Sequence, residues 1–166
     1  MAEDVCFLEQ RNVIFVSVHE ESDSPEWLDK VHPFMSKVLD KLEYKGWELS
    51  VMFCGDSFIR QLNKQYREID SPTDVLSFEQ GDSYTDEDGR TWFSAGDIVV
   101  SLDTLRRNAQ DFNVPVDEEL KRLLLHGILH LAGYDHSDNS PEQEMLKFQE
   151  TVLSNLLTDA DIIIEK

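Results

Sequence analysis

Three histidines in one short segment are the residues of this chain best placed to do chemistry. They are His126, His130 and His136, and the other two of the chain's five histidines lie far away in the sequence. Residues four apart on an α-helix project from one face, with roughly 5–6 Å between Cβ atoms, so His126 and His130 can reach one ion. Gly133 can take the left-handed conformation that ends a helix, which would bring His136 back as a third ligand.

Three imidazoles on one ion leave one tetrahedral position open. Structural zinc sites are usually closed by four protein ligands, whereas three protein ligands and a water are typical of hydrolytic zinc. A single histidine on an apolar helix is more often a buried, hydrogen-bonded side chain, but three at this spacing favour a metal site. The segment therefore predicts a catalytic centre that holds one zinc or similar divalent ion per chain.

The spacing equals that of the metzincin peptidases, His-Glu-x-x-His-x-x-Gly-x-x-His, with one difference. Position 127 is glycine, where the peptidases carry glutamate. That glutamate takes a proton from the metal-bound water and passes it to the leaving amine. Because Gly127 has no side chain, the segment keeps the ligand pattern but disfavours peptide hydrolysis.

Hydrophobic periodicity and turn residues place the elements that must position the histidines. Strands are predicted near residues 13–18, 48–54, 75–78 and 97–101. Helices are predicted near 25–46, with an irregularity or late start at Pro33, and near 56–66, 102–112, 116–132 and 141–156. The histidine helix is apolar on nearly every side, so it should be central and buried. These elements predict a single α/β domain of the α+β type over residues 1–166, with a mixed four-stranded sheet packed with about five helices.

The predicted helix near 56–66 carries a basic stripe. Arg60, Lys64 and Arg67 fall at i, i+4 and i+7, so they share one side of the helix. The stripe is the best candidate for a phosphate track, and a solvated flank is the alternative. For the same helix we expect Asp56 or Ser57 as N-cap and an inward face made of Ile59, Leu62 and Tyr66.

Composition limits the kinds of partner that the protein can bind and the compartment in which we expect it. The formal net charge of −19 counts against general nucleic-acid binding, but salt limits the reach of exposed charges to about 8 Å, so a focused site is not excluded. The acidic stretch from Gly81 to Gly89 reads as an exposed hairpin loop. No apolar run approaches the ~18 residues of a membrane span, and the N-terminus lacks the basic start of a secretory signal, so we expect a cytoplasmic protein. Cys6 and Cys54 fit no metal or redox pattern, so we assign them no chemical role.

Three segments, together with the closing helix, carry a resemblance to a known family. They are the histidine segment 125–136, the stretch 62–78 from Leu62-Asn63-Lys64-Gln65-Tyr66-Arg67 to Val75-Leu76-Ser77-Phe78, and Gly96-Asp97-Ile98-Val99-Val100-Ser101. With them, the sequence resembles the YbeY family of bacterial rRNA maturation factors, described as single-metal endoribonucleases.

The resemblance implies roles for individual residues and for partners. His126, His130 and His136 would hold zinc or a similar divalent ion, and Arg67 would be the basic residue of the catalytic cleft. The family implies processing of ribosomal RNA, especially near the 3′ end of the small-subunit RNA, and ribosome quality control. The implied partners are ribosomal RNA and the small ribosomal subunit, with no membrane and no small-molecule cofactor.

Several alternatives stay open at this point. The Arg67 guanidinium can stabilise charge on a phosphodiester, or it can form a helix-end salt bridge to Glu68 or Asp70. Asp135 can fix an imidazole tautomer or be a surface acid. Three functions remain, in order of preference: a metal-dependent endoribonuclease, a metallohydrolase of another substrate class, and a ribosome assembly factor whose metal is mainly structural.

Overall fold

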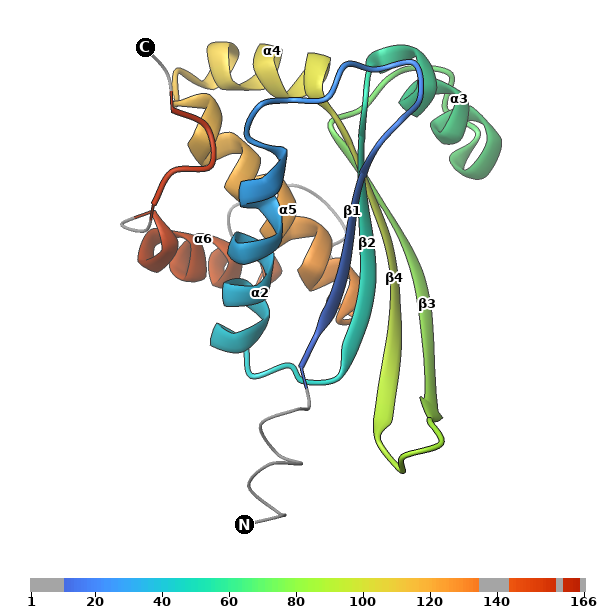
Figure 1. Cartoon of the computed structure of the whole chain (residues 1–166). Helices are drawn as coiled ribbons and strands as arrows, with labels where there is room; N and C mark the ends of the chain where they lie inside the picture. The colour runs from blue at the N-terminus through green and yellow to red at the C-terminus, as the bar shows by residue number, and fades with distance from the viewer. Residues whose placement is uncertain (1–10, 135–143, 158–159, 165–166) are drawn as a thin grey trace.

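The computed structural model describes residues 11–134, 144–157 and 160–164 (Figure 1). The described elements in chain order are β1 (Val13–Val18), a short 3-10 helix η1 (Leu28–Lys30), α2 (Val31–Lys41), β2 (Trp47–Cys54), α3 (Asp56–Arg67), β3 (Val75–Thr85), β4 (Thr91–Ser101), α4 (Leu102–Phe112), α5 (Val116–Leu131) and α6 (Glu144–Leu156). Pro33 lies in the first turn of α2, where its missing N–H has no partner to lose, so the helix starts late, as predicted.

The four strands form one mixed sheet in the order β1-β2-β4-β3. The strand β2 pairs in parallel with both β1 and β4, while β3 pairs antiparallel with β4 at the edge. In the part of the chain that the structure describes, a mixed four-stranded sheet and five α-helices confirm the predicted α+β architecture. Within the described ranges, no helix is both long and apolar enough to cross a bilayer.

Helices cover the two faces of the sheet unequally. On one face lies the large core, to which α2, α4 and α5 contribute together with α6, which packs on α5. On the other face, α3 covers a small cluster (Figure 1). That small cluster contains Cys54, whose burial raises the pKa of its thiol to about 12 and keeps it protonated at neutral pH. The helix α5 is central, as predicted: between Leu123 and Leu131 every residue except the two histidines is buried.

Two local predictions on α3 are wrong. The helix has no side-chain cap of its own, because the backbone N–H of Asp56 donates to Asp103 Oδ2 of α4 at 2.9 Å. Tyr66 does not face inward. It is 59% exposed and meets Phe78 edge to face, since α3 covers only one end of the sheet.

The predicted acidic loop is also mostly strand. The ladder of β3 and β4 continues to the pair Thr85 and Thr91, so the turn is only residues 86–90. Polar contacts also join this extension to the rest of the sheet, such as the hydrogen bond from Tyr84 Oη on β3 to Glu48 Oε1 on β2 at 2.6 Å. Polar composition indicated a loop here because both faces of this extension are largely exposed.

Gly96 generates the first testable prediction. Its φ is +137°, and a Cβ atom at this position would lie 2.0 Å from the carbonyl oxygen of Phe78. We expect Gly96→Ala to lower the free energy of unfolding in urea by about 3 kcal/mol or more, from the strained backbone and the clash together.

The matched control for this prediction is Gly81→Ala. Gly81 has a φ of +74° but open space around it, so alanine there should cost only about 1 kcal/mol. Equal losses for the two variants would contradict the close approach of β3 to Gly96.

Candidate functional site

The last two turns of α5 bring His126 and His130 together at the edge of the sheet. Both side chains are half-buried, and their Nε2 atoms lie 3.0 Å apart. Two imidazole nitrogens bound at ~2.0–2.1 Å to one tetrahedral ion would lie roughly 3.3 Å apart. The two rings therefore point toward a common centre, and the pair fits a shared divalent ion.

Gly133 ends α5 as the spacing predicts. Its φ is +98°, its N–H donates to the carbonyl oxygen of His130, and the N–H of Tyr134 donates to that of Leu129, both at 3.0 Å. This is a Schellman motif, which reverses the chain direction. His136 and Asp135 lie outside the described residues. Among the residues that are described, no group of three His, Cys, Asp or Glu side chains converges on one point.

Gly127 faces the sheet. A Cβ atom at this position would lie 2.8 Å from Cδ1 of Ile98 on β4. Glycine thus allows α5 to approach the strand closely, and a glutamate side chain at residue 127 has no space on this side of the helix. The packing of α5 on β4 therefore requires glycine at residue 127, where the peptidases carry glutamate.

A cleft of about 1290 Å³ lies in front of the histidine pair, lined by residues of α5, α6 and β3 and by the end of α3. Arg67 lies on its wall with His126 and His130. The Arg67 Nη2 atom donates to the carbonyl oxygen of Ser77 at 3.2 Å, and this is its one polar contact within the described ranges. The guanidinium keeps further donors for a ligand.

The rest of the basic stripe does not reach the cleft. Arg60 forms an ion pair with Asp70 at 2.7 Å, and Lys64 lies 4.0 Å from the same carboxylate. Asp70 therefore partners these two residues instead of Arg67. The structure separates the predicted phosphate track into an exposed pair, Arg60 and Lys64, that shares the carboxylate of Asp70, and one arginine in the cleft.

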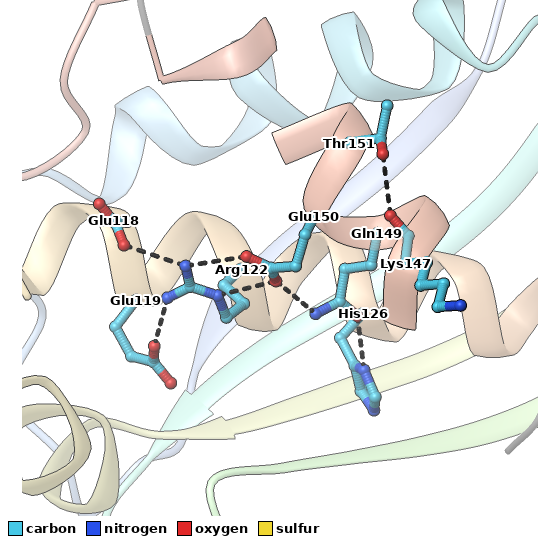
Figure 2. Close-up of polar contacts among 8 residues, drawn as sticks. All are labelled: Glu118, Glu119, Arg122, His126, Lys147, Gln149, Glu150 and Thr151. Atoms are coloured by element: carbon cyan, nitrogen blue, oxygen red, sulfur yellow. Dashed lines mark hydrogen bonds and ion pairs between the residues drawn. The ribbon is translucent and has the colours of Figure 1, made fainter. Parts of the chain in front are cut away.

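Arg122 is a cleft residue that sequence reasoning missed. Figure 2 shows its guanidinium held by three carboxylates: Glu118 at 2.9 Å, Glu119 at 2.9 Å and Glu150 at 3.0 Å. Burial lowers the pKa of Arg122, but the hydrogen bonds to the three carboxylates outweigh it and raise the pKa above its ordinary value. Burial raises the pKa of Glu119, against the opposite effect of Arg122. The guanidinium of Arg122 is therefore occupied by carboxylates of the protein itself.

Gln149 of α6 is the second residue that was missed. Its side chain is 4% exposed, and its Oε1 atom lies 2.7 Å from His126 Nδ1 (Figure 2). A signal for Arg122 was present in the sequence, because Glu118, Arg122, His126 and His130 follow one another at four-residue intervals on α5. Gln149 carried no such signal, since its partner lies 23 residues away in the sequence.

Two further residues of the segments that carry the resemblance, Ser77 and Asp97, make contacts within the protein. Ser77 contributes its backbone carbonyl to Arg67. Asp97 on β4 accepts a hydrogen bond from Ser50 on β2, which links neighbouring strands. Ser77 also lines the cleft.

The fold is shared with a solved bacterial protein. The solution structure of TM1509 from Thermotoga maritima superposes with a TM-score of 0.60 at 29% sequence identity, and the match covers 87% of this chain and 89% of that chain. The chain therefore shares the α+β fold of this protein. Its own histidine pair and Arg67 lie in one cleft.

Sequence comparison defines the family. Residues 14–157 match the family model described as Endoribonuclease YbeY. A Treponema denticola protein named Endoribonuclease YbeY is 63% identical over 140 residues, covering 83% of this chain and 90% of the relative. One of the same name from Aquifex aeolicus is 39% identical over 132 residues, covering 80% and 85%. The chain belongs to the YbeY family.

The Arg122 cluster yields a prediction about stability. Glu119 is almost fully buried, so removing its partner in Arg122→Met should lower the free energy of unfolding at neutral pH by about 3 kcal/mol. The double variant Arg122→Met, Glu119→Gln should recover part of this loss. As the control, Lys64→Met removes a 4.0 Å surface contact and should cost less than about 1 kcal/mol. A similar small loss for Arg122→Met would show that the cluster is not stabilising.

Proposed function

We propose that this chain is a metal-dependent endoribonuclease that cleaves ribosomal RNA in the cytoplasm. The observation that carries the proposal is the convergence of His126 and His130, 3.0 Å apart at Nε2, in a cleft that also holds Arg67. The description of the family as an endoribonuclease supports cleavage of RNA at internal phosphodiester bonds. The proposed substrate is RNA of the small ribosomal subunit near its 3′ end, and the assembling subunit is the proposed partner.

The proposed metal ligands are His126, His130 and His136, with zinc as the proposed ion. A divalent ion bound there would supply Lewis acidity and would lower the pKa of a coordinated water towards ~7. The two described histidines are suited to this role because α5 is buried on its other sides, which holds the ring positions. Their partial exposure leaves one side of the pair open to the cleft.

Arg67 would bind the scissile phosphate. A planar guanidinium can donate to two phosphate oxygens at once and stabilise the negative charge that grows in the transition state. Arg122, by contrast, is occupied by Glu118, Glu119 and Glu150. Peptide bonds are disfavoured as substrates, because position 127 cannot hold the glutamate that protonates a leaving amine.

Metal content provides the first test. Purified protein should contain about one divalent ion per chain by elemental analysis, and His130→Ala should lose both the ion and the cleavage of a small-subunit RNA precursor, since one ligand is removed. Prolonged chelation of the wild type should likewise abolish cleavage, and added zinc should restore it. Full activity of metal-free wild type would contradict the proposal.

Substitution of Arg67 separates catalysis from metal binding. We expect Arg67→Ala to keep the metal and to lower single-turnover cleavage roughly 10²-fold, the usual effect of removing one transition-state donor. Arg60→Ala, on the same helix but paired with Asp70 outside the cleft, is the matched control and should cleave at the wild-type rate. Loss of metal from Arg67→Ala would instead assign this arginine to the stability of the site.

A further inference from the structure

The Nδ1 edge of His126 faces a second helix, α6, which forms part of the cleft wall. Gln149 of α6 lies against this edge, with its Oε1 atom 2.7 Å from Nδ1, and the glutamine side chain is 4% exposed (Figure 2). A buried polar side chain must find hydrogen-bond partners in the protein. The proposed reaction gives Gln149 no chemical step, so its role has to lie in what it does to the histidine.

Glu150 determines which way the Gln149 amide points. Gln149 Nε2 lies 3.3 Å from Glu150 Oε2, and an ionised carboxylate can only accept a hydrogen bond. The amide NH₂ group must therefore face Glu150, which turns the amide oxygen toward His126. Arg122 donates to the same carboxylate from Nε at 3.0 Å and from Nη2 at 3.2 Å, so both oxygens of Glu150 act as acceptors.

We infer that Gln149 is a positioning residue that holds His126 in the tautomer protonated at Nδ1. An amide oxygen carries no proton, so the hydrogen bond at 2.7 Å requires the histidine to donate it. A neutral imidazole protonated at Nδ1 has its lone pair at Nε2, which is the atom that faces His130. The amide thereby prepares Nε2 as a ligand atom without adding a negative charge beside the site.

The inference rests on the proposed function in one respect, namely that His126 Nε2 binds a metal ion. The tautomer is a property of the metal-free chain, so it can be measured without any metal or RNA. Metal-ligating histidines commonly donate their other ring N–H to a neighbouring acceptor, and losing that acceptor typically costs 10–100-fold in metal affinity. Gln149 would be that acceptor, and the ion pair of Arg122 and Glu150 would orient it.

Long-range ¹H–¹⁵N NMR of histidine-labelled, metal-free protein tests the tautomer directly. The measurement is made about two pH units above the ordinary imidazole pKa of ~6.5, where the ring is neutral. We expect a pyrrole-type shift at Nδ1 and a pyridine-type shift at Nε2 of His126. The reverse pattern in the wild type would overturn the inference, whatever the variants do.

Variants at residue 149 test whether the Gln149 amide determines the tautomer of His126. Gln149→Met keeps the length of the side chain but removes the acceptor, so the His126 signals should shift toward the Nε2-protonated form. Gln149→Glu keeps an acceptor and should retain the wild-type pattern, which also decides the matter if Gln149→Met does not fold. Gln61→Met, at an exposed position on α3, is the control and should change nothing. An unchanged tautomer in Gln149→Met would contradict the role of the amide.

Zinc titration against a chromophoric chelator then separates this inference from the proposed function. If both hold, Gln149→Met should bind zinc roughly 10–100-fold more weakly than the wild type, and Gln61→Met should bind it equally well. If the wild type binds no zinc but its tautomer depends on Gln149, the proposed metal chemistry is wrong and the positioning role stands. Equal zinc affinity of wild type and Gln149→Met would overturn the link between tautomer and metal.

Discussion

The close packing of α5 on β4 at Gly127 is the constraint on which the rest of the structure depends. Because the helix meets Ile98 at the one residue without a Cβ atom, Gly127 points at the sheet and the rotation of the helix is fixed. At 100° per residue, His126 and His130 then project to the same side, only about 40° apart around the helix axis. The sheet thus sets the direction of both imidazoles, and the cleft forms where that side of α5 leaves the core.

The cleft is lined by side chains of both charges: Arg67, Arg122 and Lys147, and Asp74, Glu79, Glu119 and Glu150. The net charge of −19 is spread over the molecule, and three of its carboxylates are used to hold Arg122. Arg67 and Lys147 line the same cleft, and neither forms an ion pair with a carboxylate among the described residues. These two cationic groups can contact a phosphate directly, at distances shorter than the screening length of about 8 Å, although acidic side chains line the same cleft.

Sequence reasoning succeeded where a pattern is local. The helix Leu102–Phe112 and the buried character of α5 follow from 3.6-residue periodicity, and the left-handed Gly133 follows from its place after the last apolar turn. Sequence reasoning failed where a feature depends on a contact between residues far apart in the sequence. The N-terminal cap of α3 comes from Asp103 on another helix, and Gln149 meets His126 only because α6 packs on α5. The exposed ladder of β3 and β4 has little burial pattern to detect, so its polar residues indicated a loop.

Histidine spacing alone does not define a chemistry, because it specifies ligand positions and leaves the rest of the site open. In the metzincin pattern, the residue after the first histidine faces the substrate and supplies the base. Here the same position faces β4 and is filled by the packing of Ile98, so the sheet occupies the space that a base would need. The cleft on the open side of the pair includes Arg67, an arginine from α3 that has no carboxylate partner among the described residues. This exchange of a carboxylate for a guanidinium is what shifts the expected substrate from a neutral peptide to an anionic phosphodiester.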